Sequence, residues 1–425
     1  MFDIFNLPDF TLPEDFLLGS ATAPHQIEGD NVHSGHWKYE QEEVLRNPKF
    51  QVSGKACNHY NMVDEDVKML AALGHKAYRM GVEWARIEPQ EGVFDKAATA
   101  HYVHELELLK KNGIKTFVTL VHFSMPLWFE EKNGFFDLDN FAYFERYLRY
   151  ILPIISPYVD FWNVFNEFNL GTTERFLNRK FNKTICHARA YRIIKEYSSA
   201  PVSSAHALLQ YYGARQSDPF DTALQGYLDA VDNEFFFHAI RTGELVVPGK
   251  DGIYDKEIKG TCDFWSINLY VRQMVDARKA KCKTRSMPYT HMQMISEPFY
   301  LEEFWPETMF NGLTRCMDKP VYITENGCCC DNDDFRIIYI AEFLSALNAA
   351  RQTGVDVRGY LYWSFMDNYE WSSYAPRFGM VGVDRQTFAR TPKPSAYFYK
   401  EIIENKAFKQ DILRKYLKSI PTLKK

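Results

Sequence analysis

Two glutamates stand at the ends of apolar runs in this 425-residue chain. Glu167 closes the run YVDFWNVFNE (158–167), and Glu325 lies near the end of PVYITENG (320–327). An ionised carboxylate at the end of a buried run is costly unless it is paired or used. For either glutamate alone, a structural salt bridge or a helix cap explains the position as well as a catalytic role does. As a pair, two carboxylates can divide the work of a general acid and a nucleophile.

The elements that must position these glutamates alternate in type along the chain. Runs rich in β-branched and aromatic residues alternate with helical patterns, which favours parallel strands and right-handed crossovers. We predict eight strands, at residues 16–23, 76–84, 114–123, 158–167, 201–207, 262–270, 320–327 and 357–367. Eight such units predict a closed (β/α)8 TIM barrel. The open doubly wound sheet is the alternative, but the glycine-rich turn that it needs after an early strand is missing.

Helical periodicity is clear in four stretches, at residues 60–74, 101–113, 141–151 and 334–354. A barrel of this kind needs about 250 residues, so the surplus predicts long loops and extra helices. No low-complexity segment or flexible linker divides the sequence. We therefore expect residues 1–425 to form a single catalytic barrel domain.

Polar side chains gather where the predicted strands stop, which is where barrels of this kind place their chemistry. Their types differ from the Ser, Gly, Asp and Lys of ordinary loops, and they suit a pocket for a polyhydroxylated ring. They are Gln26, Glu28, His122, Asn166, Glu167, Asn268, Tyr270, Glu325, Asn326, Trp363, Asp367, Asn368, Glu370 and Trp371. Two carboxylates across such a pocket are what hydrolysis of a glycosidic bond requires.

Seven motifs carry a resemblance to a known family. In chain order they are FLLGSATAPHQIEGD, YRMGVEWARIEPQEGVFD, TLVHFSMPLW, WNVFNE, SINLY, YITENG and YWSFMDNYEW followed by RFGMVGVD. Together they resemble glycoside hydrolase family 1, the family of retaining β-glucosidases and β-galactosidases, over nearly the whole chain. Any one motif could arise by chance, whereas seven in register are specific.

The resemblance implies roles for the residues around the two glutamates. Glu167 would be the general acid/base and Glu325 the nucleophile. Arg79 and Tyr270 would hydrogen-bond Glu325 and keep it ionised, because a neighbouring cation lowers the pKa of a carboxylate. Asn268 would line the same side of the pocket as Arg79 and Tyr270. For Arg79 a structural pairing, with Glu83 for example, is the competing interpretation.

The resemblance also implies a set of sugar-binding residues. Gln26, His122 and Asn166 would hold ring hydroxyls, and Asn166 would hold the 2-hydroxyl. Trp363 would stack under the ring. The outer end would be formed by Glu370, which would bind outer hydroxyls, and by Trp371. Taken singly, His122 and Trp363 could also be ordinary core residues.

The implied mechanism is a double displacement with net retention. Glu167 would start protonated, with its pKa raised by burial and by the negative charge of Glu325. Glu325 would attack and form a glycosyl-enzyme ester, and Glu167 would then take a proton from water. For a retaining enzyme we expect the two carboxyl groups to lie about 5–5.5 Å apart, whereas roughly 6.5–9.5 Å would imply inversion.

Two family variants bear on the substrate. Thioglucosidases carry glutamine at the acid/base position, where this chain has Glu167. Phospho-β-glucosidases typically carry serine in place of Glu370 with a lysine and a tyrosine nearby, and WSSYAPRFG (371–379) offers no lysine. The sequence thus predicts hydrolysis of unphosphorylated β-D-glucosides, with β-galactosides and β-fucosides as further candidates. A transglycosidase and a non-catalytic sugar-binding protein on the same barrel remain open alternatives.

Several positions depart from the family pattern. Phe168 replaces the usual proline after the acid/base, Leu18 and His25 replace an aromatic residue and a tyrosine, and the segment 171–184 is short. These changes lie near the leaving-group side, so they leave the aglycone preference open. The aromatic stretch 297–307 could form a compensating wall or could simply pack on the barrel.

Composition bounds the remaining possibilities. The net charge of −5 gives no basic surface for nucleic acid, and no apolar run reaches the 18 residues of a membrane span. The start of the chain has no signal-peptide pattern, so we expect a cytoplasmic protein. The eight cysteines form no regular framework and are expected to be free thiols. Cys328, Cys329 and Cys330 are adjacent, which disfavours a metal site, so we expect no metal and no cofactor. The oligomeric state stays open.

Overall fold

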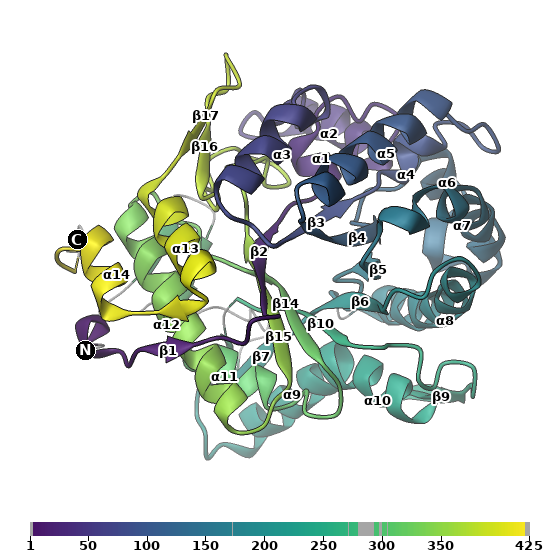
Figure 1. Cartoon of the computed structure of the whole chain (residues 1–425). Helices are drawn as coiled ribbons and strands as arrows, with labels where there is room; N and C mark the ends of the chain where they lie inside the picture. The colour runs from purple at the N-terminus through teal and green to yellow at the C-terminus, as the bar shows by residue number, and fades with distance from the viewer. Residues whose placement is uncertain are drawn as a thin grey trace.

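The computed structural model describes residues 3–171, 173–270, 272–278, 293–296, 300–303 and 305–420. Eight parallel strands form a closed barrel surrounded by helices (Figure 1). In order around the barrel they are β2 (Leu17–Ala21), β3 (Ala77–Gly81), β4 (Lys115–Val121), β5 (Phe161–Asn166), β6 (Val202–Ala207), β10 (Trp265–Asn268), β14 (Val321–Asn326) and β15 (Val357–Trp363), which pairs with β2. Each strand lies within a predicted run, and the prediction of a (β/α)8 barrel is confirmed.

The helices lie outside the barrel and account for much of the surplus length. They are α1 (Pro24–Ile27), α2 (Gly35–Arg46), α3 (Val63–Ala72), α4 (Trp84–Ile87), α5 (Lys96–Lys111), α6 (Leu127–Glu131), α7 (Phe141–Ile155), α8 (Glu174–Tyr197), α9 (Pro219–Asp229), α10 (Phe235–Thr242), α11 (Glu307–Leu313), α12 (Asp333–Gln352), α13 (Pro394–Asn405) and α14 (Gln410–Tyr416). The four predicted helical stretches correspond to α3, α5, α7 and α12, with shifted ends.

The shifted ends have local causes. Tyr60, assigned to the first predicted helix, lies in a short 3-10 turn (His59–Asn61), and α3 begins only at Val63. Helix α5 begins earlier than its apolar stripe, because the side chain of Asp95 accepts hydrogen bonds from the backbone of the first turn.

Helix α8 escaped prediction although it spans 24 residues. Its buried face contains Lys180, Lys183, Thr184 and His187 beside apolar residues. Polar groups on the inner face break the apolar stripe on which recognition of a helix from sequence depends. This helix borders the candidate site described below.

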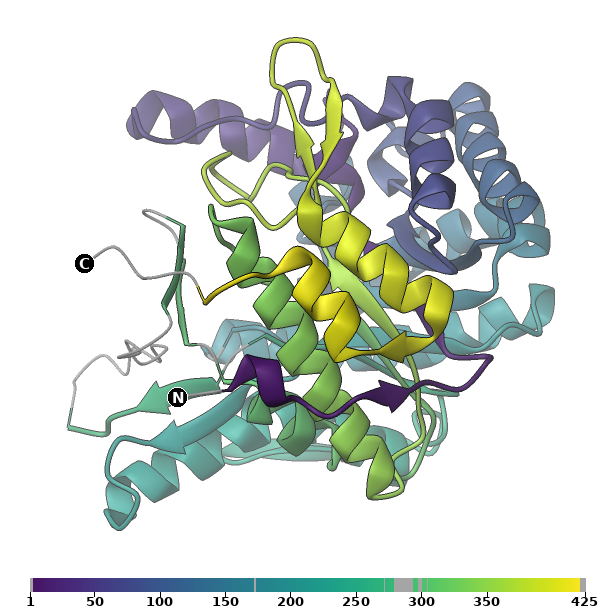
Figure 2. The same cartoon turned by 60° about the vertical axis from the view of Figure 1, so that its left-hand side comes forward.

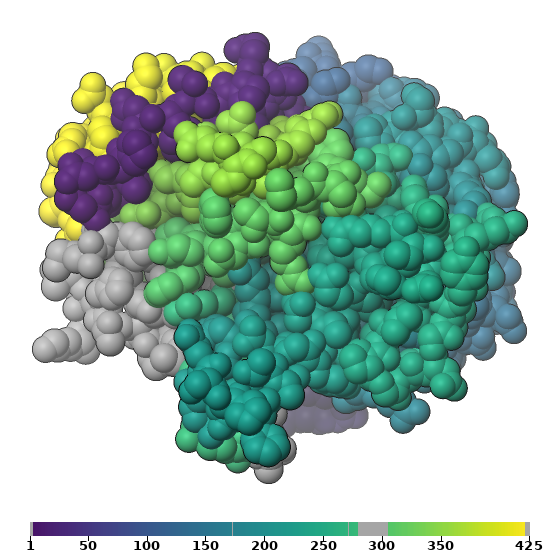
Figure 3. Space-filling view, turned by 90° about the horizontal axis from the view of Figure 1, so that it is seen from below, coloured from purple at the N-terminus to yellow at the C-terminus, as the bar shows by residue number. Residues whose placement is uncertain are grey.

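The described residues also form five small two-stranded sheets outside the barrel. They are β1 (Phe10–Thr11) with β18 (Ala407–Phe408), β7 (Gln210–Gly213) with β11 (Arg272–Val275), β8 (Glu244–Val247) with β9 (Lys250–Tyr254), β12 (Gln293–Ser296) with β13 (Tyr300–Glu303), and β16 (Val381–Val383) with β17 (Arg390–Pro392). The first pair joins the two ends of the chain, so the N-terminal segment runs beside α13 and α14 (Figure 2). From below, the middle of the chain, coloured teal to green, forms a broad face (Figure 3).

The barrel is closed at one end by aromatic rings. Phe117, Phe161, Phe264 and Tyr322 come from the amino ends of four strands, and Phe117 and Phe161 stack with ring centroids 4.2 Å apart. A larger apolar cluster fills the space between the strands and the helices. The interior is thus packed at the amino ends, and polar groups collect at the carboxyl ends. Among the described residues, none of the helices has the length and apolarity to cross a membrane.

Candidate active site

Glu167 and Glu325 both lie at the carboxyl end of the barrel. Glu325 is the fifth residue of β14 and is 4% exposed. Glu167 directly follows β5, and its backbone N–H donates to the carbonyl of Ala205 at 2.8 Å. Its φ of 42° is in the left-handed region, which is uncommon for a residue other than glycine and concentrates at functional sites.

Glu325 is held by a cation and a hydroxyl. Arg79 Nη1 donates to Glu325 Oε1, and Tyr270 Oη donates to Oε2 at 2.8 Å. Arg79 is fully buried and is fixed by a second hydrogen bond, from Nε to Thr119 Oγ1 at 3.0 Å. The predicted contacts of Arg79 and Tyr270 with Glu325 are confirmed. The competing partner Glu83 instead caps α4 by accepting from Ala85 N at 3.2 Å.

Glu167 has a different environment. Asn268 Nδ2 donates to Glu167 Oε1 and to Asn166 Oδ1, both at 3.0 Å. Asn268 is itself oriented by Thr324, whose hydroxyl donates to Asn268 Oδ1 at 2.8 Å. Within the described part of the chain, no cationic side chain forms a hydrogen bond or an ion pair with Glu167. The two carboxylates are therefore chemically distinct.

This difference decides where a shared proton lies. Burial of the carboxyl group, followed by the negative charge of Glu325, raises the pKa of Glu167 to about 8. Burial also raises the pKa of Glu325, and Arg79 and the Tyr270 hydroxyl oppose that shift without cancelling it. The expected rise for Glu167 is confirmed. A proton shared by the two groups is favoured on Glu167, because Glu325 is the one that forms the ion pair with Arg79.

A chain of hydrogen bonds joins the two glutamates to an aromatic wall, which is formed by the rings of His122, Trp363 and Trp371. Arg79 Nη2 donates to Asn166 Oδ1 at 2.6 Å, and Asn166 Nδ2 donates to His122 Nε2 at 3.0 Å. Burial and the charge of Arg79 lower the pKa of His122 well below its usual value, so the ring is neutral and can accept this bond. The His122 ring is near-parallel to those of Trp363 and Trp371, with centroids 6.0 Å and 6.3 Å away.

Gln26 lies at the outer end of this wall. Its Nε2 donates to Glu370 Oε2 at 3.0 Å, to Asn368 Oδ1 at 3.1 Å and to the carbonyl of Tyr369 at 2.9 Å. Its Oε1 is buried and has no hydrogen-bond partner in the part of the chain that the structure describes. An unpaired buried acceptor beside a carboxylate is suited to receive hydroxyl groups from a ligand.

Sequence reasoning treated His25 only as a departure from the family, and the structure gives it a positioning role. Its ring stacks on Trp371 with an interplanar angle of 3° and centroids 5.9 Å apart. His25 Nε2 also hydrogen-bonds Glu40 Oε1 at 2.7 Å, and Glu40 accepts from Ser53. A histidine can replace a tyrosine here because a flat ring with a polar edge still packs against the indole.

Three of the polar residues at the predicted strand ends serve other purposes. Glu28 accepts from Arg86 Nε at 2.6 Å and from Tyr102 Oη at 2.9 Å. Asn326 Nδ2 donates to the carbonyl of Leu269 and to Tyr339 Oη. Asp367 pairs with Lys393 at 2.8 Å. The strand-end pattern identified polar positions correctly, but it could not separate groups with protein partners from groups open to a ligand.

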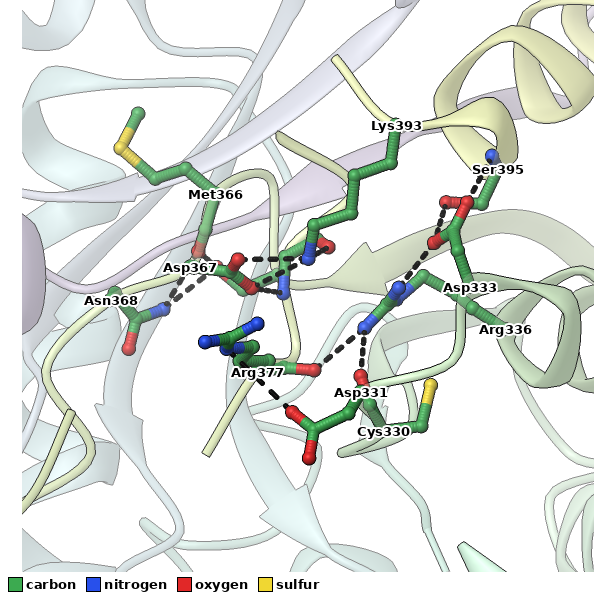
Figure 4. Close-up of polar contacts among 12 residues, drawn as sticks. Cys330, Asp331, Asp333, Arg336, Met366, Asp367, Asn368, Arg377, Lys393 and Ser395 are labelled. Atoms are coloured by element: carbon green, nitrogen blue, oxygen red, sulfur yellow. Dashed lines mark hydrogen bonds and ion pairs between the residues drawn. The ribbon is translucent and has the colours of Figure 1, made fainter. Parts of the chain in front are cut away.

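Gly327 and the three cysteines follow the Glu325 strand. A Cβ at Gly327 would lie 1.7 Å from the carbonyl oxygen of Trp363, so the close approach of β15 requires glycine. Cys328 and Cys330 are buried with their Sγ atoms 3.5 Å apart. Arg336 donates to the carbonyls of Cys330 and Arg377 and pairs with Asp333 (Figure 4). These contacts anchor the loop behind the site.

The cysteines in the described part of the chain are free thiols, as expected: Cys57, Cys186, Cys262, Cys316, Cys328, Cys329 and Cys330. Among the described residues, no three His, Cys, Asp or Glu side chains are grouped so that they could hold a metal ion. Residues 297–299 and 304 of the aromatic stretch lie outside the described residues, so the predicted wall 297–307 is not characterised.

Comparison with known proteins agrees with this geometry. Residues 9–408 match the sequence profile of Glycosyl hydrolase family 1. The chain is 28% identical to Beta-glucosidase A from Acetivibrio thermocellus, over 94% of this chain and 99% of that protein. It is 26% identical to a 6-phospho-beta-galactosidase from Staphylococcus epidermidis, with the same coverage. A solved beta-glycosidase from Pyrococcus horikoshii superposes with a TM-score of 0.86 at 31% identity, covering 96% of this chain and 98% of that one.

Proposed function

Because the chain belongs to glycosyl hydrolase family 1 and is a retaining β-glycosidase, we propose that it hydrolyses unphosphorylated β-D-glucosides, with Glu167 as acid/base and Glu325 as nucleophile. The observation that carries the proposal is the unequal treatment of the two carboxylates. Glu325 has Arg79 and Tyr270 as donors, whereas Glu167 has an amide donor and a pKa of about 8. One group is prepared to attack as an anion and the other to donate a proton.

In the first step, Glu325 attacks the anomeric carbon of the bound glycoside. The carbon–oxygen bond to the aglycone breaks, and Glu167 donates its proton to the departing oxygen. Arg79 and Tyr270 orient the attacking carboxylate. The glycosyl ester that results leaves Glu325 uncharged, so its contribution to the high pKa of Glu167 disappears.

In the second step, Glu167 acts as a base. With its pKa lowered, it accepts a proton from water, whose oxygen attacks the anomeric carbon and displaces Glu325 as a carboxylate. Two inversions at the same carbon return the β-configuration. The mechanism uses the two carboxylates and one water.

The surrounding residues would bind the sugar. Asn166, next to the acid/base, would hold the 2-hydroxyl, a contact that can strengthen in the transition state. The remaining proposed contacts are the hydrogen bonds of Gln26, His122, Asn268 and Glu370 with ring hydroxyls and the packing of Trp363 and Trp371 against the ring.

The proposed preference for an unphosphorylated sugar rests on the negative charge of Glu370, at the end of the pocket that would bind the outer hydroxyls. Glu370 accepts from Gln26 there, and its carboxylate would repel a phosphate. The one cation in the stretch 371–379 is Arg377, which lies 3.6 Å from Asp331 in an exposed ion pair (Figure 4). The similar proteins include both a beta-glucosidase and a 6-phospho-beta-galactosidase, so this substrate choice is a proposal.

A panel of nitrophenyl β-glycosides of glucose, galactose, fucose, mannose and 6-phosphoglucose tests the proposal. We expect the highest kcat/KM for glucose, and NMR of the first-formed sugar should show the β-anomer. Turnover of 6-phosphoglucoside alone would overturn the assignment of Glu370. Absence of turnover on every substrate would favour the non-catalytic sugar-binding protein, and transfer to added alcohol in preference to water would favour the transglycosidase.

A further inference from the structure

A cavity of about 380 Å³ adjoins Glu167, and its lining does not include His122, Trp363 or Trp371. It lies between α6, α8 and the chain that follows β5, and Phe123, Phe135, Phe136 and Phe168 contribute to its lining. Its volume is within the range of small-molecule sites. Because the acid/base residue is part of its wall, a leaving group protonated by Glu167 can extend into it.

Three cations from α8 line the same cavity. Arg175, Arg179 and Lys183 are four residues apart, so they share one face of the helix. Within the described part of the chain, none of the three forms an ion pair with a carboxylate. Arg179 donates from Nη2 to the carbonyl of Leu170 at 3.4 Å, and its buried Nε has no hydrogen-bond partner.

Lys183 is the most enclosed of these cations. It is 5% exposed, and its Nζ lies over the rings of Phe135 and Phe165 at 5.1 Å and 4.9 Å from their centroids. No hydrogen bond to Lys183 Nζ is formed by any described residue. A buried side-chain ammonium group with no ion-pair partner among the described residues is unusual, because buried charges are normally paired.

The other titratable groups that line the cavity are Glu167, Glu130 and His36, and none of them forms an ion pair with Lys183. Glu130 on α6 attracts Lys183 through space without forming an ion pair, and burial raises the pKa of Glu130 to about 7. His36 on α2 is neutral, because burial lowers its pKa to about 3. Burial, followed by the charge of Arg179, lowers the pKa of Lys183 to about 7. A bound anion would stabilise the charged forms of Lys183 and Arg179.

We propose that this cavity is a leaving-group subsite for an aromatic aglycone that bears a carboxylate, with Lys183 and Arg179 as the residues that select it. The inference rests on the proposed function, because the aglycone must be attached to a sugar that Glu167 and Glu325 cleave. The phenylalanine rings would pack against the aryl group. The guanidinium and the ammonium would receive the carboxylate in charge-assisted hydrogen bonds.

The test uses two β-glucosides that differ in one charge. One has a 3-carboxyphenyl aglycone and the other has the methyl ester of the same aglycone. At pH 6, where Lys183 is protonated and Glu130 is largely neutral, we expect kcat/KM to favour the carboxylate about tenfold, the effect of one charge-assisted hydrogen bond. The preference should appear mainly in KM, because the carboxylate contact is made equally in the ground and transition states.

Variants then separate the charge of Lys183 from its packing. Lys183→Met should remove most of the tenfold preference while hydrolysis of the ester stays unchanged, and Lys183→Arg should retain the preference. Arg189→Gln is the matched control, since it removes a cation from an exposed position of the same helix outside the cavity. If Lys183→Met does not fold, Arg179→Gln gives the same comparison.

The possible outcomes are distinct. If the ester is hydrolysed and the wild type shows no preference for the carboxylate, the inference is wrong and the proposed function stands. A preference that persists in Lys183→Met and Arg179→Gln would also overturn it. Failure to hydrolyse either glucoside would count against the proposed function itself, and calorimetric binding of free 3-hydroxybenzoate that Lys183→Met abolishes would then still support the subsite.

Discussion

Cations have different partners on the two sides of the cleft between Glu325 and Glu167, which are the nucleophile side and the leaving-group side. Behind the nucleophile, Arg79 pairs with Glu325, Arg336 with Asp333 and Lys393 with Asp367. Figure 4 shows how the second and third of these pairs anchor the loop after β14 and the segment after β15. Beyond the acid/base, the cations of α8 that line the cavity have ring faces and a carbonyl as neighbours.

This difference distinguishes cations that stabilise the fold from cations that can bind a ligand. A buried cation with its carboxylate and carbonyl partners fixes the backbone, and its removal leaves those partners unsatisfied. A buried cation without a carboxylate partner lowers the stability of the fold. We infer that such a cation is retained where a ligand supplies the opposite charge. Helix α8 contains both kinds within one turn, because Lys180 pairs with Asp232 at 2.5 Å and Lys183 has no such partner among the described residues.

The largest expected effect comes from breaking the nucleophile side. Glu325→Ala should lower kcat for an activated β-glucoside by at least about 10⁴-fold, since the covalent step is lost. Azide can enter the space that the carboxylate leaves and attack from the same face. We therefore expect partial rescue by sodium azide with an α-glucosyl azide as product, identified by NMR.

Glu28→Gln is the matched control for this variant. Glu28 is also a buried carboxylate after a barrel strand, but it contacts Arg86 and Tyr102, and burial raises its pKa to about 7. Glutamine resembles its protonated form, and Glu28 hydrogen-bonds neither Glu167 nor Glu325, so the folded variant should keep activity within about tenfold of the wild type. Near-normal hydrolysis by Glu325→Ala would show that another group is the nucleophile.

The next effect is on stability and tests the pairing directly. Arg336→Met should lower the free energy of unfolding by about 3–5 kcal/mol, because Asp333 and two carbonyls lose a buried donor. Lys180→Met should act in the same direction, whereas Lys183→Met should leave stability at pH 7 unchanged or raised. Urea unfolding of the three variants measures the difference. Equal losses in Lys180→Met and Lys183→Met would remove the distinction between the two sides.

Sequence reasoning was accurate where chemistry follows the strands. The barrel strands are apolar runs whose ends are marked by residues such as His122 and Glu325, so one short window contains both the element and its functional group. The contacts of Arg79 and Tyr270 with Glu325 came from the family resemblance and are confirmed. Each of these depends on neighbours that the barrel topology brings together in a fixed order.

Sequence reasoning failed where the partner is distant or the pattern is hidden. Nothing in the sequence near Glu28 shows that its carboxylate would hydrogen-bond Arg86 and Tyr102 instead of a ligand. The cations of α8 have a recognisable spacing of four, but their meaning depends on the absence of an ion-pair partner among the described residues. That absence is a property of the folded cavity, which residues from α6, α8 and the segment after β5 line together.

The smallest expected effect concerns the acid/base and sharpens the contrast between the two glutamates. Glu167 must be protonated to act as an acid, so kcat/KM should fall about tenfold per pH unit above pH 8. The acid limb should lie above the ordinary pKa of a glutamate, because burial raises the pKa of Glu325, which must be ionised. Both limbs report the coupled pair.

Carbon-13 NMR of labelled glutamate carboxyls in Glu325→Gln identifies the source of the alkaline limb. Removing the negative charge should lower the pKa of Glu167, and burial should still hold it above the usual value, since burial is the larger of the two causes. The signal of Glu130, whose pKa lies at about 7, is assigned by its loss in Glu130→Gln. An unchanged pKa of Glu167 would mean that the two carboxylates do not sense each other, and the division of roles between the two sides of the cleft would lose its electrostatic basis.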